Sequence, residues 1–229
     1  MWWLIAIIAV AILVVWLIDI GNKANVVDWG GKSINWIDGF GRVLCRTFHH
    51  LPEDKIPLPE TGAAIVVANH VSGLDPFLLI AACKRPLRFL IAREQYDRPI
   101  LHWLFKASGC IPVDRSGKPE LALRQALRAL EAGEVLALFP HGKIHLDSDP
   151  PRKLKGGAIR LSAWTQTEIY PVRINGVGGE GYEALAPFIP SHVHLAVGGP
   201  VICQSDGMAE CLNYIASVIE SEERARRRV

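Results

Sequence analysis

The sequence predicts an α/β fold with a mostly parallel central sheet flanked by helices, preceded by a membrane-anchor helix and an adjoining amphipathic helix. Three observations support this prediction. Residues 1–18 carry no polar or charged side chain. From residue 57 onward, short apolar runs alternate with stretches of helical periodicity, as in strands joined by crossover helices. The chain has 229 residues, of which 21% are charged, and is therefore long enough for one domain with a substantial core.

Residues 1–20 are expected to form the membrane-anchor helix. The 18 apolar residues would span about 27 Å as a helix, close to the thickness of the hydrocarbon core of a bilayer. A signal peptide is the alternative, but it needs a basic segment before the apolar run and a small-residue cleavage site after it. The basic residues instead follow the run, at Lys23, Lys32, Arg42 and Arg46. The positive-inside rule therefore places the main domain on the cytoplasmic face of the inner membrane.

Residues 33–51 are expected to form an amphipathic helix next to the anchor. Their apolar positions recur at helical spacing, at Ile34, Ile37, Leu44, Phe48 and Leu51. Such a helix lies either in the headgroup plane of a membrane or against the core of its own domain, and the sequence leaves both interpretations open.

The α/β domain is expected over residues 57–229. Apolar runs predict strands at 63–68, 88–92, 135–139, 169–174 and 192–197. Helical patterns predict helices at 76–83, 119–132 and 156–165. A final helix, N-capped by Asp206, is expected to run into the arginine-rich tail. The glycine-rich residues 176–181 predict a loop.

Cysteine usage and charge exclude several classes of function. The five cysteines are odd in number and widely spaced, which argues against a disulfide framework or a zinc ribbon and indicates a reducing compartment. The net charge of +2 is too small to predict nucleic-acid binding. Basic clusters at 84–88, 152–155 and 224–228 are either solvated faces or contacts for anionic lipid headgroups.

The most informative stretch is the polar loop between the strand at 63–68 and the helix at 76–83. In a parallel sheet such a turn lies at the carboxyl edge, where ligands bind. The loop carries His70 and Asp75, close enough in the chain to pair. A carboxylate bonded to one imidazole nitrogen leaves the other nitrogen as a general base. The structural alternative is that Asp75 is a helix N-cap, forming a capping box with Ser72.

A series of sequence blocks, in order, resembles the signatures of the glycerolipid acyltransferase family, whose best-known members acylate lysophosphatidic acid. The first is Asn69-His70, followed by Asp75 after four residues. The second, residues 109–115, is similar to the family pattern Gly-x-Ile-x-Val-x-Arg. The third is residues 139–143, Phe-Pro-His-Gly-Lys, where the family has Phe-Pro-Glu-Gly-Thr. Residues 155–158 and 169–172 resemble the later Lys-x-Gly and apolar-Pro-Val elements of the family.

This resemblance implies an O-acyltransferase in which His70 deprotonates the acceptor hydroxyl and Asp75 orients the imidazole, without a covalent acyl-enzyme. The residues that it implies for substrate binding are Asn69, Arg115, His141, Gly142 and Lys143. The expected partners are the bilayer, a lysolipid acceptor, and acyl-CoA or acyl carrier protein as co-substrate. No further cofactor, no metal and no nucleic acid are expected. Arg115 in particular has the fork geometry that binds a phosphate bidentately.

The third block departs from the family pattern and leaves alternatives open. The family glutamate is His141 here, the threonine is Lys143, and the arginine that often follows is Ile144. Lysophosphatidic acid is the first expected acceptor, and another lysolipid, such as an amino-lipid, is the second. The histidines and carboxylates of residues 141–149 also suggest a metal-dependent hydrolase of lipid headgroups. A membrane-tethered scaffold without catalysis is a further alternative.

Overall fold

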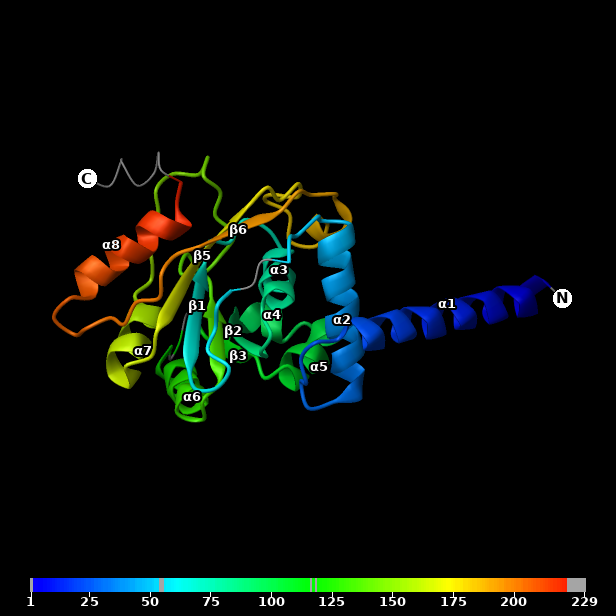
Figure 1. Cartoon of the computed structure of the whole chain (residues 1–229), viewed down its shortest axis with the longest axis horizontal. Helices are drawn as coiled ribbons and strands as arrows, with labels where there is room; N and C mark the ends of the chain where they lie inside the picture. The colour runs from blue at the N-terminus through cyan, green and yellow to red at the C-terminus, as the bar shows by residue number, and fades with distance from the viewer. Residues whose placement is uncertain (1, 54–55, 116, 118, 222–229) are drawn as a thin grey trace.

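The central element of the fold is strand β1 (Ala64–Ala68), all five residues of which are buried. The computed structural model describes residues 2–53, 56–115, 117 and 119–221, and Figure 1 shows their arrangement. The other strands are β2 (Leu87–Ala92), β3 (Ile111–Val113), β4 (Val135–Leu138), β5 (Ile169–Asn175) and β6 (His194–Val197). They form one sheet in the order β3-β2-β4-β1-β5-β6.

All strand pairs are parallel except β5 with β6, which is antiparallel. On β1, Val66 is in register with Ala137 of β4 and with Tyr170 of β5. The carboxyl ends of β1 and β4 therefore lie side by side, so the loops that follow these strands meet at one edge of the sheet. The mostly parallel sheet expected from the sequence is confirmed.

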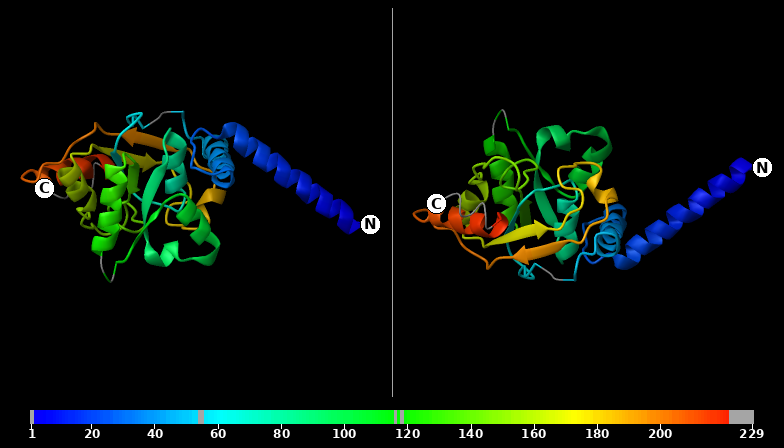
Figure 2. Two further views of the ribbon diagram at one scale, coloured as in Figure 1. Left: turned by 90° about the horizontal axis from the view of Figure 1, so that it is seen from below. Right: turned by 90° about the horizontal axis from the view of Figure 1, so that it is seen from above.

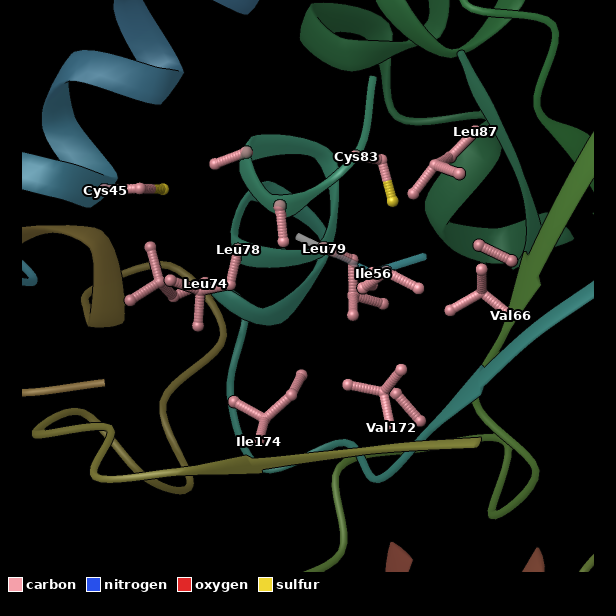
Figure 3. Close-up of a cluster of buried hydrophobic side chains, with 14 of the residues drawn as sticks. Cys45, Ile56, Val66, Leu74, Leu78, Leu79, Cys83, Leu87, Val172 and Ile174 are labelled. Atoms are coloured by element: carbon pink, nitrogen blue, oxygen red, sulfur yellow. The ribbon is translucent and has the colours of Figure 1, made fainter. Parts of the chain in front are cut away.

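Helices cover both faces of the sheet. They are α2 (Lys32–Thr47), α3 (Asp75–Ala82), α4 (Arg93–Tyr96), α5 (Pro99–Ala107), α6 (Pro119–Glu131), α7 (Gly157–Thr165) and α8 (Met208–Ile219), with a 3₁₀ turn η1 (Ala186–Phe188). One core packs Leu78 and Leu79 of α3 against Val66 and Val172, as Figure 3 shows. The second core packs α6, α7 and α8 against the opposite face of the sheet, around Ile65.

The N-terminal helix α1 (Trp2–Ala24) projects away from the α/β domain (Figure 1). By length and composition it is apolar enough to cross a membrane, and most of its side chains are exposed. Its C-terminal end crosses α2 at two glycines. A Cβ on Gly39 would lie 1.8 Å from the Gly21 carbonyl oxygen, and one on Gly21 would lie 2.2 Å from the Trp36 carbonyl oxygen. Only glycine at both positions allows the two backbones to approach this closely.

Helix α2 packs on the domain, between α1 and α3. It ends at Thr47 rather than at residue 51 and buries an ion pair as well as apolar side chains. Arg42 Nε donates to Asp38 Oδ2 over 2.7 Å, and Arg42 Nη1 donates to the Ala81 carbonyl oxygen over 3.2 Å. Because both charges are paired and hydrogen-bonded, they are tolerated in the interior.

Other differences from the sequence expectations lie in short elements and at the C-terminus. Strand β3, helices α4 and α5, and η1 were not predicted. The last helix is N-capped by Gly207, not by Asp206, and it ends at Ile219; the arginine-rich tail lies outside the described residues. Cys203 and Cys211 form a disulfide, so the expectation of unpaired cysteines is wrong for these two. A backbone bridge joins Ile169 to Val201, two residues before Cys203, and Cys211 lies in the first turn of α8.

Candidate active site

The loop after β1 brings His70 and Asp75 together. His70 Nδ1 and Asp75 Oδ2 are 2.7 Å apart, and the Asp75 side chain is fully buried. The same Oδ2 accepts the backbone N–H groups of Val71 (2.6 Å) and Ser72 (2.9 Å), while Oδ1 accepts the Ser72 hydroxyl (2.9 Å). These bonds hold the carboxylate in one orientation. Asp75 is the first residue of α3 and makes no N-cap bond, because its oxygens are used by the loop.

His70 lines a cavity, and Nδ1 is the ring nitrogen that pairs with Asp75. Since an ionised carboxylate only accepts hydrogen bonds, Nδ1 carries the hydrogen in this pair, and Nε2 of the neutral ring keeps its lone pair. The ring stacks on Phe139, with 4.1 Å between ring centroids and 14° between planes. The His70 carbonyl oxygen accepts the His145 backbone N–H over 2.7 Å. The imidazole is therefore fixed by a carboxylate, a ring and its own backbone.

The cavity has a volume of about 830 Å³ and is lined from α2, α3, β2, α5 and the loops after β3 and β4. This volume falls in the range of natural ligand pockets. Its apolar lining includes Phe77, Ile80, Leu87, Phe89, Leu104 and Phe105. Its cationic lining comprises Arg98, Arg115, Lys143, Lys155 and Arg160. A single cavity thus offers His70 together with surfaces for a hydrocarbon chain and for an anionic group.

The cationic side chains gather around Gly142. Arg115 Nη2 donates to the Gly142 carbonyl oxygen, and Arg115 Nη1 lies 3.1 Å from Glu94 Oε1. Gly142 has a φ of +73°, and a Cβ there would lie 2.5 Å from Lys155 Nζ. Glycine therefore permits both the left-handed turn and the approach of the lysine. Partial desolvation, with Arg115 and Arg152 nearby, lowers the pKa of Lys155, which the Glu94 carboxylate partly opposes.

Lys155 and Arg160 were not among the expected site residues, although both line the cavity. Lys155 belongs to the basic run 152–155 and to the Lys-Gly-Gly block, and either signal would have pointed to it. Arg160 is on α7, and the helical pattern alone did not distinguish it from a solvated surface residue.

Asn69 and His141, both expected to contact substrate, do not line the cavity. Asn69 is buried, and its amide bonds both backbone groups of Ile174 on β5, donating over 2.9 Å and accepting over 2.7 Å. His141 is also buried, because the turn at Gly142 directs its side chain inward. Its Nε2 lies 3.5 Å from Glu220 Oε1, and its ring centroid lies 4.4 Å from that of His145. The structure thus gives both residues supporting positions.

The residues suggested for a metal site do not converge. Among the residues that the structure describes, no group of three or more His, Cys, Asp and Glu side chains is arranged to hold a metal ion. His145 is 3.4 Å from Asp149, and His141 faces Glu220 instead. The arrangement offers a general base in a mixed apolar and cationic cavity.

Comparison with known proteins identifies the family. The model of the acyltransferase family matches residues 50–175, which is more than half of the chain and contains the His70 loop, Arg115 and Gly142. The chain belongs to the acyltransferase family.

Two relatives and one solved structure are similar to this acyltransferase. A probable 1-acyl-sn-glycerol-3-phosphate acyltransferase of Mycoplasma pneumoniae is 34% identical over 51% of this chain and 46% of its own length. A lyso-ornithine lipid O-acyltransferase of Rhodobacter capsulatus is 39% identical over 38% of this chain and 30% of its own length. The chain spans 55% of the length of one curated relative that it matches, 46% of the Mycoplasma protein and 30% of the Rhodobacter protein.

The fold matches that of the crystal structure of the 1-acyl-sn-glycerophosphate (LPA) acyltransferase PlsC from Thermotoga maritima. The TM-score is 0.66 at 22% sequence identity, covering 86% of this chain and 80% of the other. This likeness confirms the α/β fold with helices on both faces of a mostly parallel sheet.

Proposed function

We propose that this acyltransferase moves a fatty acyl chain from an acyl-CoA or acyl carrier protein thioester to the hydroxyl of a lysolipid, with lysophosphatidic acid as the first candidate acceptor. The observation that carries the proposal is the buried Asp75 carboxylate on Nδ1 of His70, at a residue that lines a cavity of mixed apolar and cationic character. The name of the Mycoplasma relative supports the acceptor. The reaction needs no cofactor besides the thioester co-substrate.

The proposed mechanism uses His70 as base and then as acid. Nε2 takes the proton from the acceptor hydroxyl, and the oxygen attacks the thioester carbonyl to form a tetrahedral intermediate. The carbon–sulfur bond then breaks, and the leaving thiolate takes the proton from Nε2, so the ring returns to its neutral form. Asp75 holds the ring orientation and stabilises the transient imidazolium. The ester oxygen is that of the acceptor, and no enzyme group is acylated.

The acceptor phosphate is proposed to bind Arg115, Lys143 and Lys155 around Gly142. The guanidinium and the two ammonium groups line the same cavity as His70. A phosphate displacing Glu94 as the partner of Arg115 would form charge-assisted hydrogen bonds. Ile144, which stands where the family often has an arginine, contributes no charge, so Lys143 and Lys155 take that role in the proposal.

An amino-lipid acceptor is the second candidate. The observations that favour it are the changed third block and the similarity to a lyso-ornithine lipid O-acyltransferase. The cavity is also lined by the carboxylates Asp114, Glu120 and Glu183, which suit an ammonium group. The two candidates differ in the charge of the headgroup and are separable by experiment.

The test combines one substitution with an acceptor panel. His70→Gln should reduce acyl transfer by about 10²-fold or more at an unchanged melting temperature, because the general base is lost. His194→Gln, on the exposed strand β6, is the matched control and should keep full activity. A fully active His70→Gln variant would refute the mechanism. With one labelled thioester, turnover of lyso-ornithine lipid but not of lysophosphatidic acid would replace the first acceptor by the second.

Membrane anchorage by α1 is part of the same proposal. The helix is 23 residues long and its apolar surface is solvent-exposed in the isolated chain, which suits a hydrocarbon environment. The positive residues that follow it support a catalytic domain on the cytoplasmic face of the inner membrane. The substrate is itself a membrane lipid in this proposal, so the anchor holds the active site where the acceptor is found.

A further inference from the structure

Helix α5 and the segment around η1 expose large apolar side chains to solvent. On α5, Ile100 is 83% exposed and Trp103 is 50% exposed, and on η1, Phe188 is 76% exposed. Ile100 and Trp103 are three positions apart and therefore share one face of the helix. None of the nine residues of α5, all within the described part of the chain, is buried. Exposed apolar surface of this kind marks an interaction site.

The two segments lie side by side and border the cavity of His70. Arg98 Nη2, at the start of α5, is 3.5 Å from Glu183 Oε2 in the segment that leads to η1. Leu101 and Leu104 of α5 line the cavity, as does Pro187 of η1. We call Arg98, Ile100, Trp103, Lys106, Leu185 and Phe188 the rim surface. Its apolar side chains are thus continuous with the element that encloses the active-site cavity.

The direction of α1 places the rim surface toward the membrane. Both views of Figure 2 show α5 (green) and η1 (gold) on the side of the domain toward which α1 extends. The close glycine crossing of α1 with α2 fixes this direction relative to the domain. Because an apolar helix of this length enters the bilayer along its axis, surfaces that project in the same direction meet the same membrane.

We propose that the rim surface lies in the headgroup region of the bilayer that α1 enters, and that the lipid bilayer is its occupant. The chemistry fits an interface, since Trp103 and Phe188 are accompanied by the exposed cations Arg98 and Lys106. Acyl chains then pass between the bilayer and the cavity without crossing water. This inference rests on the membrane anchorage by α1 in the proposed function, and its test uses no enzymatic activity.

The test is site-specific fluorescence quenching on the full chain. Single substitutions Ile100→Cys and Phe188→Cys are labelled with an environment-sensitive fluorophore. The protein is then reconstituted into phosphatidylethanolamine–phosphatidylglycerol vesicles containing a nitroxide-labelled lipid. The native thiols interfere little: Cys203 and Cys211 are paired, and burial raises the pKa of Cys45 and Cys83 to about 12 and also raises that of Cys110. A protonated, buried thiol reacts slowly.

Two reference positions make the result decisive. Trp164→Cys is the matched control, because Trp164 is also an exposed aromatic residue and its helix α7 lies far from α1 (Figure 1). Ile8→Cys reports on α1 itself. We expect quenching at positions 8, 100 and 188 to exceed that at 164 several-fold. Quenching at position 8 but not at positions 100 and 188 would overturn the proposed membrane contact of the rim surface and would still support membrane anchorage by α1. Absence of quenching at all four would overturn both.

Discussion

Asn69 continues the pairing of β1 with β5 through its side chain. The backbone ladder ends at Ala68 with Val172, and the Asn69 amide then bonds the N–H and the carbonyl oxygen of Ile174. These bonds fix the point where the chain leaves the sheet, one residue before His70. The Asn69 side chain therefore positions the His70 loop and does not line the cavity.

Asn69→Ala should destabilise the protein and leave acceptor affinity unchanged. Each buried backbone group left without a partner costs about 1–3 kcal/mol of unfolding free energy. The measurement is urea unfolding together with KM for the acceptor, and Asn213→Ala, exposed on α8, is the control. A raised KM at unchanged stability would instead support the substrate-binding role that the sequence suggests.

Lys155 should give acceptor binding a dependence on alkaline pH. Its pKa is lowered by partial desolvation and by Arg115 and Arg152, so the ammonium loses its proton at a lower pH than an ordinary lysine. As pH rises through this lowered pKa, the cation is lost and KM for a phosphate-bearing acceptor should rise. Lys155→Arg keeps the charge and should remove the rise. The measurement is KM between neutral and alkaline pH.

The matched control for Lys155 is its neighbour Lys153, which does not line the main cavity. Lys155→Met should raise KM about tenfold or more, because hydrogen bonds to charged groups contribute roughly 1.5–3 kcal/mol. Lys153→Met should not change it. Equal effects of the two variants would mean that both lysines act through the overall positive charge near the cavity, and that Lys155 makes no specific contact with the acceptor.

At the scale of elements, the close crossing of α1 and α2 requires a glycine at position 39 but not at position 41. A Cβ on Gly39 meets the Gly21 carbonyl oxygen, whereas a Cβ on Gly41 meets only Phe77 Cδ1 at 3.7 Å, an ordinary contact. Gly39→Ala should therefore lower the melting temperature of the purified full chain. Gly41→Ala should leave it unchanged or raise stability by up to about 1 kcal/mol, since alanine favours the helix. Circular dichroism on both variants checks this, and equal melting temperatures would contradict the close crossing.

Long, periodic elements could be predicted from the sequence, and short ones could not. The strands around β1 are runs of buried apolar residues, and the predicted bounds agree within two residues. Strand β3 has three residues and contains Pro112, so it shows no alternation. In helix α5, Leu104 lines the cavity whereas Ile100 is exposed to solvent. Both residues are apolar, so the sequence does not show which face of the helix is directed toward the cavity. Tertiary packing decides such cases.

In the candidate site, the sequence predicted which residues lie close together but not the direction in which their side chains point. Sequence spacing placed His70 beside Asp75, because a five-residue loop at a strand end leaves few alternatives. It did not show that His141 turns inward, because that depends on the left-handed φ at Gly142 and on space beside Glu220. The sequence also did not identify Lys155 as part of the cationic lining of the cavity, because Lys155 is close to Gly142 only in the folded chain.

At the scale of the whole molecule, two features indicate opposite compartments. The cations that follow α1 favour a cytoplasmic domain, whereas the Cys203–Cys211 disulfide is typical of oxidising compartments. A cytoplasmic domain should carry both cysteines as thiols in the cell, with the disulfide forming after purification in air. Both side chains are buried, so the fold should hold them close in either state.

Thiol trapping in intact cells decides between the compartments. Cells are quenched with acid and the denatured protein is alkylated with a mass-shifting maleimide. Five modified cysteines are expected for a cytoplasmic domain, because all five cysteines of the chain are then reduced. Only three modified cysteines would mean that the disulfide exists in the cell, which would contradict the proposed topology. The purified protein gives the reference value for the oxidised state. Closing this short loop is worth roughly 2–3 kcal/mol in the chain-entropy model, so reduction should lower the melting temperature without unfolding the domain.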